Sequence, residues 1–485
     1  MMPLKLVAAL VMLASTQAEI QRPSSCLSPL PRHKITQKMH GLPAHSLASA
    51  EKPAPDAAVE VRGGVMSNNA RGALSIAGGM MVHLALGTMY CWGNFMSYMP
   101  RSMLFFDGAA ANGRTPDALL VLPGALLGLN IGLQFGSRLN NKIGVRPSSF
   151  LGGLCFALSV FLGSFQTELA PFMLIYSLFF GVSIGIAYTA PMVAGWSWFP
   201  NRKGFVSGCV LAAFGAGGFL GNKVGSAIVN PESVQAVAGA FPPEIYANFP
   251  KMLRKLAGIY LVITLVGSSF IKANPATITP VKASSAKKAS GMTCGEALKS
   301  KNFYLLWTMI VLSATAGLNT IGVYKTFGQT VEVLNDDAYL SLMGGLGALF
   351  NGLGRLFWAS MVDRYGFKKP FQISVAIQAV MMACYRKFAV SKVSFAIATC
   401  AIFSCIGGNF AMAPTVTNIA FGSAQAAQIY AVLFTAFVTA SIGGSIVTKR
   451  LLKAAGWDVV FYALAGGSVA SIGISRMLQT AEEKD

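Results

Sequence analysis

The sequence predicts an all-α membrane protein that crosses the bilayer many times. Hydrophobic residues make up 54% of its 485 residues and charged residues only 12%, a balance that excludes an ordinary water-soluble domain. Apolar segments of about 20 residues, the length that spans a bilayer, recur along the chain. A repeated set of motifs divides these segments into two equal groups. We therefore expect twelve transmembrane helices in two six-helix bundles.

The apolar segments fix the order of the expected helices. The ninth is short and runs into Tyr385, Arg386 and Lys387, so eleven helices or a re-entrant segment are alternatives to twelve. The twelve segments are 73–99, 118–137, 148–166, 170–196, 204–228, 253–271, 303–324, 338–360, 371–385, 393–415, 427–448 and 457–475.

Basic residues gather in alternate connections between these segments. The net charge of +20 is therefore not expected to reflect nucleic-acid binding, because Lys and Arg mark the loops that stay on the non-translocated side of a membrane. Both ends of the helical body are expected on that inner side. The basic residues are Arg138, Lys142, Arg146, Arg202, Lys203, Arg364, Lys368, Lys369 and six lysines between Lys272 and Lys301.

The first 71 residues have the pattern of a targeting leader. Residues 1–18 contain an early lysine, an apolar run and a small-residue cleavage site, which predicts a signal peptide. Residues 20–50 are basic and contain no acidic residue, which is typical of a transit peptide. The two together resemble the bipartite leader of proteins sent to complex plastids. A disordered tail behind a secretory signal, for the plasma membrane or endomembranes, is the alternative.

The first expected helix carries polar residues at helical spacing. His83, Tyr90 and Asn94 are separated by seven and four residues, which places them on one face. Polar groups on one face of a membrane helix usually point inward. We expect all three to line a binding cavity, although His83 alone is also compatible with a hydrogen bond to a neighbouring helix.

Two landmarks occur twice at almost the same offset. A loop motif with an acid or amide, a base, a glycine and a second base appears around Gly144 and again around Gly366, 222 residues later. Pro191 and Pro414 end similar apolar motifs 223 residues apart. This agreement predicts an internal duplication of six helices. The loop residues are Asn141, Lys142, Gly144, Arg146, Asp363, Arg364, Gly366 and Lys368.

Arg355 lies inside an otherwise apolar helix. A charged residue at the bilayer centre costs about 2.5–3.5 kcal/mol, so it is expected to face a cavity or a partner. Its planar guanidinium matches a carboxylate with two parallel hydrogen bonds. We predict that Arg355 binds an anionic ligand; the alternative is an arginine that donates only to helix carbonyls.

Several segments resemble the oxalate:formate antiporter and monocarboxylate transporter groups of the major facilitator superfamily. They are GTMYCWGNF at 87–95, WSWFPNRKGFVSG at 196–208, and the Asn-Gly-x-x-Arg pattern that ends in Arg355, and the resemblance covers roughly residues 72–475. It implies the major facilitator fold, alternating access, and carboxylate binding by Arg355. It also implies that Tyr90 and Trp92 line the cavity and that the two loop motifs take part in gating.

The repeat suggests further cavity residues. Asn409 and Phe410 of the tenth helix correspond to Ala187 and Tyr188 of the fourth. We expect Tyr188, Asn409 and Phe410 near the ligand, with the Tyr188 hydroxyl bonded to a partner.

Differences from these groups narrow the range of substrates that we expect. Asn351 stands where proton-coupled carriers have an aspartate, and Phe437 stands where the oxalate antiporter has a lysine. No drawn span has an acidic residue at its centre, and Lys325 is expected to reach the membrane interface. One fixed cation suits one carboxylate, such as pyruvate, lactate or formate, moved by exchange or uniport. A proton-coupled symporter and an oxalate-type dicarboxylate exchanger remain alternatives.

The expected organisation follows from these assignments. After the signal peptide and a leader with a polar linker at 19–71 come one bundle at 72–271, an inner linker at 272–301, a second bundle at 302–478 and a tail at 479–485. No span carries paired carboxylates or a metal motif, so an enzyme, a metal and a cofactor are not expected. The expected partners are a small organic anion and the lipid bilayer, with a monomeric chain. A non-transporting sensor or scaffold is the alternative from another functional class.

Overall fold

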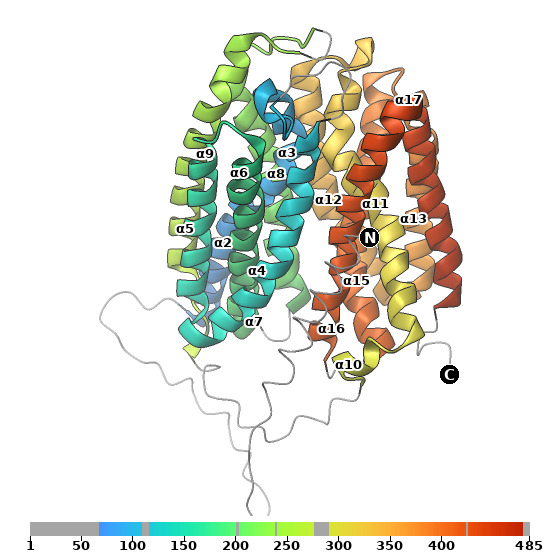
Figure 1. The fold of residues 1–485 in the computed structure, drawn as a ribbon. Helices are drawn as coiled ribbons and strands as arrows, with labels where there is room; N and C mark the ends of the chain where they lie inside the picture. The colour runs from blue at the N-terminus through green and yellow to red at the C-terminus, as the bar shows by residue number, and fades with distance from the viewer. Residues whose placement is uncertain are drawn as a thin grey trace, which may run out of the picture. The chain divides into compact units, whose positions relative to one another are not determined.

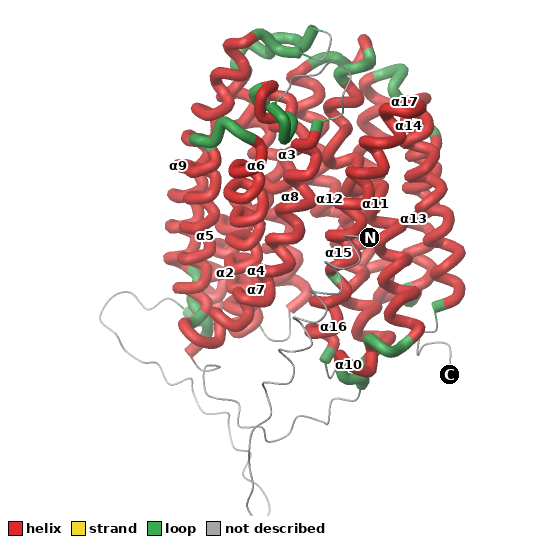
Figure 2. Tube along the Cα trace, viewed as in Figure 1, coloured by secondary structure: helices red, strands yellow, loops and turns green. Residues whose placement is uncertain are grey.

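The computed structural model describes residues 67–108, 116–199, 203–237, 240–275, 291–422 and 425–478. Within them the regular structure is helical, and the β-type pairings are two isolated bridges, Val237 with Ala240 and Gly291 with Gly422 (Figure 2). The described residues from Asn68 onward belong to one compact unit. The expected signal peptide lies outside the described residues, as does the expected leader up to residue 66.

Every expected span has a helical counterpart. The helices of the N-terminal half are α2 (Asn68–Leu86), α3 (Trp92–Phe95), α4 (Val121–Ile143), α5 (Val145–Gly163), α6 (Leu169–Phe172), α7 (Phe180–Trp198), α8 (Lys203–Val229) and α9 (Pro243–Phe270). Those of the C-terminal half are α10 (Cys294–Ala297), α11 (Lys301–Gly328), α12 (Asp337–Tyr365), α13 (Lys368–Ala383), α14 (Tyr385–Phe388), α15 (Lys392–Phe421), α16 (Ala426–Leu433) and α17 (Thr435–Met477).

Helices of one half pack mainly with each other. In the N-terminal half α4 packs on α7 and α5 on α9, and in the C-terminal half α11 packs on α17 and α12 on α15. Figure 1 shows the blue-to-green helices beside the yellow-to-red ones. The two halves meet chiefly where α8 lies along α12 and α4 along α17. A ligand site between the halves would therefore be lined by these helices and their neighbours.

The first span is not one continuous α-helix. Between α2 and α3, the segment Gly87–Cys91 forms a 3₁₀ turn. Here the chain passes so close to α8 that a Cβ on Gly87 would lie 1.8 Å from the carbonyl oxygen of Phe214. Glycine is thus required at this contact, and the tighter turn rotates every residue that follows it.

The two copies of the loop motif have the same backbone geometry. Gly144 ends α4 with φ 91°, and Gly366 ends α12 with φ 71°. Positive φ values of this kind favour glycine over residues with a side chain. Pro191 lies inside α7 and Pro414 inside α15, as their shared offset requires. The duplication seen in the sequence is therefore present in the fold.

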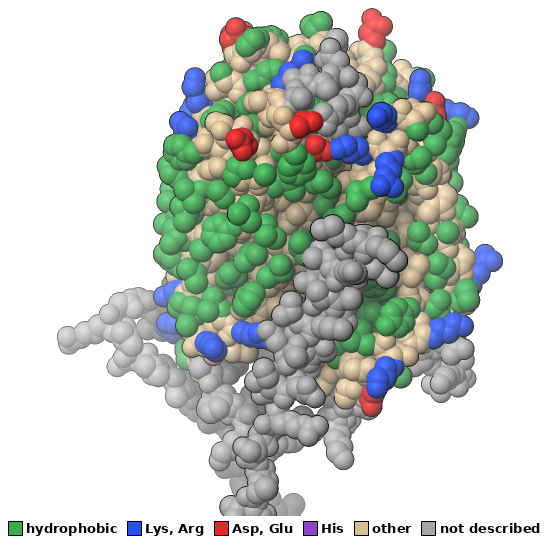
Figure 3. Space-filling view, viewed as in Figure 1, with side chains coloured by type: hydrophobic (Ala, Val, Ile, Leu, Met, Phe, Trp, Pro, Cys, Tyr) green, Lys and Arg blue, Asp and Glu red, His purple; other side chains and the backbone are tan. Residues whose placement is uncertain are grey.

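The surface and the composition of the helices fit a bilayer. Hydrophobic side chains form a belt between two ends where charged side chains gather (Figure 3). By length and composition, eight described segments are apolar enough to cross a membrane, and the last, Gln428–Met477, contains two expected spans separated by a break at Gly456. Helices α8, α12 and α13 are outside that set. The first two pack on each other between the halves, where high apolarity is not needed.

One end of the bundle carries the connections at 230–242 and 329–336, and we call it the outer end. The other end carries both loop motifs, which follow α4 and α12, and the short helix α10 (Figure 1). Helix α9 begins at Pro243, ten residues before the expected start of its span, and it extends the bundle at the outer end.

Candidate functional site

Arg355 lies about two-thirds of the way along α12 and is buried, with 8% of its surface exposed. Its Nη2 donates to the hydroxyl of Tyr90 at 2.9 Å, and its Nη1 donates to the hydroxyl of Tyr188 at 3.2 Å. Arg355 belongs to the C-terminal half and both tyrosines to the N-terminal half. The guanidinium therefore bridges the two halves through neutral partners.

The positive charge of Arg355 has no carboxylate partner among the described residues. Its Nε is buried and makes no hydrogen bond. Phe410 and Phe214 lie beside the guanidinium, with ring centres 5.1 and 5.6 Å from Cζ. A buried cation held by hydroxyls and ring faces is incompletely compensated. This arrangement is suited to an anion that accepts two hydrogen bonds, as a carboxylate does.

His83 is part of the same cluster. Its ring centre lies 5.0 Å from that of Tyr188 and 6.1 Å from that of Phe214. Its Nδ1 is 3.3 Å from the carbonyl oxygen of Gly79, while its buried Nε2 has no partner. This hydrogen bond is made within α2, and not to a neighbouring helix as the alternative for this residue expected. The second ring nitrogen is left for a ligand group or a water molecule.

Aromatic side chains from α15, from α17 and from the junction between α16 and α17 continue the cluster on the C-terminal side. Phe410 stacks on Phe437 with ring centres 4.5 Å apart, and Phe434 lies 5.2 Å from Phe437. Phe437 is completely buried. The position at which the oxalate antiporter group carries a lysine is thus filled here by an apolar ring. Among the residues that the structure describes, the cluster offers one cation, Arg355, and otherwise neutral side chains.

Three of the expected cavity residues lie elsewhere. Trp92 donates from Nε1 to the carbonyl oxygen of Ala118 at 3.0 Å and packs against Tyr176 inside the N-terminal half. Asn409 accepts a hydrogen bond from the Ser313 hydroxyl at 2.9 Å inside the C-terminal half. Asn94 binds Lys325, Ser226 and Ser341 instead of residues around Arg355. The structure therefore brings His83, Tyr90, Tyr188 and Phe410 together around Arg355. Trp92, Asn409 and Asn94 lie outside this cluster.

The two loop motifs lie at the end opposite the outer end. Asn141, Lys142 and Arg146 are exposed, and Arg146 donates from Nε to the carbonyl oxygen of Ile271 at 2.9 Å. Asp363 and Arg364 are exposed as well, and Lys368 is half-buried. The gating role of these residues stays a prediction.

A buried ion pair was not expected from the sequence. Lys325 does not reach the membrane interface: its side chain is completely buried, and Nζ lies 2.7 Å from Oδ1 of Asp337. Asp337 is the first residue of α12, so it does not contradict the expectation that no span has an acidic residue at its centre, but its carboxylate is nevertheless buried. A signal for the pair was present, because a lysine and an aspartate stand on either side of one short connection between consecutive helices. Phe214 was also not identified from the sequence as a residue of the site, since no local sequence pattern distinguishes it from a residue that only packs between helices.

The sequence matches no protein-family profile, but it is similar to known transporters. It is 27% identical over 402 residues to apicoplast pyruvate carrier 1 of Toxoplasma gondii, covering 74% of each chain. It is 26% identical over 328 residues to the oxalate:formate antiporter of Oxalobacter formigenes, covering 66% of this chain and 72% of the antiporter. An uncharacterised MFS-type transporter of Escherichia coli is 23% identical over 321 residues, with 65% of this chain and 74% of that protein covered.

Solved transporters share the fold. A point mutant of the nucleoside transporter NupG superimposes with a TM-score of 0.60 and 13% identity, covering 84% of this chain and 99% of NupG. A D-xylose–proton symporter gives a TM-score of 0.59 and 13% identity, covering 84% and 97%. The prediction of a major facilitator fold is confirmed. The chain is a small-solute transporter of this fold, and its sequence resembles the oxalate:formate antiporter and monocarboxylate transporter groups of the superfamily.

Proposed function

We propose that the chain carries a small monocarboxylate by alternating access, with Arg355 as the residue that binds the carboxylate. The observation that carries the proposal is the buried guanidinium, whose Nε is unpartnered and whose other described partners are two tyrosine hydroxyls. Substrate binding supplies the missing negative charge. Since an uncompensated charge is costly in a closed, water-poor site, occupancy lowers the cost of moving between the open states.

The number of cations favours a monocarboxylate over a dicarboxylate. Within the described cluster, the rings of Phe214 and Phe410 lie beside the guanidinium of Arg355, and Phe437 stacks on Phe410. A second carboxylate would be buried against these rings without a cation, which is unfavourable. The relative named as a pyruvate carrier supports a 2-oxo monocarboxylate as the first candidate.

The coupling mode that we propose rests on the residue that precedes Arg355 by one helical turn. Asn351 is buried there, and its Nδ2 has no hydrogen-bond partner. An amide cannot take up a proton as a carboxylate can. We therefore propose exchange or uniport, and a proton-coupled symporter remains the second candidate because the buried acid Asp337 lies elsewhere in the chain.

An exchange screen in proteoliposomes tests the substrate and the mode together. Vesicles loaded with unlabelled pyruvate are expected to take up labelled pyruvate, lactate or formate at least about tenfold faster than oxalate, because one cation pairs with one carboxylate. A pH gradient imposed on empty vesicles is expected to drive no accumulation. Preferred uptake of oxalate would contradict the substrate class, and accumulation driven by the pH gradient alone would favour the symporter.

We further propose that the leader directs the chain to a membrane of a complex plastid. The bipartite pattern of residues 1–50 and the relative named for the apicoplast support this location. Residues 1–70 fused to a fluorescent protein are expected to reach the plastid of a host cell that has a complex one, whereas residues 1–18 alone should lead to secretion. If the longer fusion were also secreted, the leader would be an ordinary secretory signal followed by a tail.

A further inference from the structure

The pair formed by Lys325 and Asp337 is the most completely buried set of opposite charges in the described part of the chain. The side chains are 0% and 3% exposed, and the atoms Nζ and Oδ1 are 2.7 Å apart. Lys325 comes from the last turn of α11, and Asp337 is the first residue of α12. Both residues therefore lie near the outer end, on consecutive helices of the C-terminal half, and they move together with that half.

The other partners of this pair come from the N-terminal half. Lys325 donates to Oδ1 of Asn94 at 2.6 Å. Oδ2 of Asp337 accepts hydrogen bonds from the Tyr98 hydroxyl at 2.7 Å and from Nδ2 of Asn230 at 2.8 Å. The ammonium group of Lys325 also lies 3.9 Å from the ring centre of Tyr98. Three neutral groups of one half thus complete the coordination of two charges that belong to the other half.

This division of partners distinguishes the pair from an ordinary packing contact. An ion pair is stable when buried only if further hydrogen bonds satisfy the charged atoms. Here those bonds exist only while the outer ends of the two halves are together. If the halves separated at this end, Asn94, Tyr98 and Asn230 would withdraw, and water would replace them around an ion pair that stays intact.

Two further contacts join the halves at the same end. Lys449 of α17 forms an ion pair with Asp117, which precedes α4. Nδ2 of Asn335 donates to the carbonyl oxygen of Ala236 at 2.8 Å, which links the connection between α11 and α12 to the one between α8 and α9. The outer ends are therefore in contact in this structure, and the buried pair lies within that contact.

We propose that Lys325 and Asp337 form a charge-neutral outer gate, which is closed by hydrogen bonds from Asn94, Tyr98 and Asn230. The ion pair does not break during the cycle. When the gate opens, water replaces the three neutral hydrogen-bond partners around the ion pair. When it closes, this water is excluded, so closing is favourable only if the charges of Lys325 and Asp337 cancel each other. The inference builds on the proposed alternating access, but it concerns residues that do not contact Arg355, and it can be tested without any substrate.

The contact between Asn335 and Ala236 provides a reporter of outer closure. Both residues are replaced by cysteine in a full-length chain whose eight native cysteines are replaced by serine or alanine. A short thiol cross-linker joins the two positions only when the outer ends are together. The rate of cross-linking in proteoliposomes, without substrate, then measures how much of the time the gate is closed.

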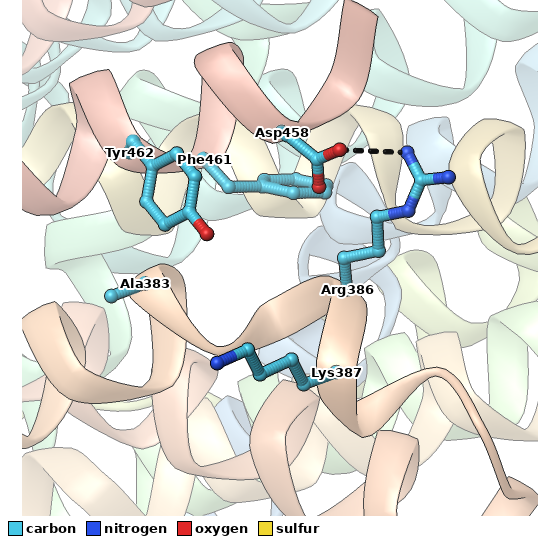
Figure 4. A pocket seen from close by; sticks show the side chains of 6 residues that line it. All are labelled: Ala383, Arg386, Lys387, Asp458, Phe461 and Tyr462. Atoms are coloured by element: carbon cyan, nitrogen blue, oxygen red, sulfur yellow. Dashed lines mark hydrogen bonds and ion pairs between the residues drawn. The ribbon is translucent and has the colours of Figure 1, made fainter.

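Asp337→Asn leaves a buried lysine without its counter-ion, and Lys325→Met leaves a buried aspartate. Each single variant is expected to slow cross-linking by at least about tenfold, since an unpaired charge opposes closure. The double variant Lys325→Met with Asp337→Asn removes both charges and is expected to recover to within about threefold of the parent. Asp458→Asn serves as the control, because Asp458 pairs at 3.0 Å with Arg386 in an exposed pocket of the same half, where the carboxylate and guanidinium face each other (Figure 4).

Thermal unfolding in detergent shows whether each variant is folded. If the single variants do not fold, Tyr98→Phe decides the question, because it removes one closing hydrogen bond and leaves the ion pair intact. Slower cross-linking in Tyr98→Phe supports the gate. The gate is ruled out if folded single variants, or Tyr98→Phe, cross-link at the parent rate. A double variant as slow as the single variants would also overturn it, since charge balance would then be irrelevant.

Discussion

Proteoliposomes that contain Arg355→Gln are expected to take up monocarboxylate at least about 30-fold more slowly than the parent protein. Glutamine keeps part of the side-chain volume and can still bond Tyr90 or Tyr188, but it carries no charge to pair with the substrate. Removing one partner of a buried charged hydrogen bond costs about 2 kcal/mol or more, which corresponds to this factor. Uptake of labelled pyruvate at a concentration well below saturation is the measurement.

Two variants separate the role of Arg355 from general effects of losing an arginine. Arg355→Lys keeps the charge but loses the planar fork, so it is expected to recover only part of the uptake. Arg386→Gln removes an arginine whose side chain is 61% exposed at the outer end, and it is expected to transport like the parent. Parent-like uptake by folded Arg355→Gln would contradict the proposed role.

Phe437→Lys is expected to shift the preference of the carrier toward a dicarboxylate. Phe437 stacks on Phe410, and Phe410 lies 5.1 Å from the guanidinium of Arg355, so a lysine at this position would bring a second cation close to the site. Uptake of oxalate relative to pyruvate should rise by about tenfold or more, because oxalate supplies the second negative charge and pyruvate leaves the lysine unpaired. Competition between labelled pyruvate and unlabelled oxalate measures the shift.

The matched control for this substitution is Phe437→Met. Methionine fills a similar apolar space without a charge. It is expected to lower uptake of both substrates without changing their ratio. If Phe437→Lys and Phe437→Met changed the ratio equally, packing and not charge would determine the specificity at this position.

The sequence predicted the architecture because the patterns that indicate it extend over the whole helical part of the chain. Apolar segments of membrane length and a duplicated motif leave few alternatives to two sets of six helices. The duplicated loop motif is part of this evidence, and in the structure its two glycines, Gly144 and Gly366, both have positive φ. Arg355 was identifiable as a buried cation because charge in an apolar helix is rare.

The membership of the cluster around Arg355 was less predictable, because it depends on local helix geometry. The shared face of His83, Tyr90 and Asn94 assumed a continuous α-helix. The 3₁₀ turn at Gly87–Cys91 rotates the chain by about 20° more per residue, so the residues after it face another direction. His83 and Tyr90 lie in the cluster, while Asn94 faces Lys325.

The buried ion pair was missed for a related reason. The expected eighth span began at residue 338, and Asp337 was taken to be part of the preceding connection. In the structure α12 begins at Asp337, and the N-terminal half supplies the hydrogen bonds that make its burial tolerable. Such partners come from residues more than 100 positions away, and no local sequence pattern reveals them.

Binding of pyruvate and of its neutral amide, pyruvamide, to the purified protein tests the role of Arg355 most directly. The two ligands have nearly the same shape, and only pyruvate carries a carboxylate. Calorimetry is expected to show that the parent protein binds pyruvate at least about tenfold more tightly than pyruvamide, and that Arg355→Gln loses this preference. Equal affinity of the parent for both ligands, or a preference for pyruvate that survives in Arg355→Gln, would contradict carboxylate binding by Arg355.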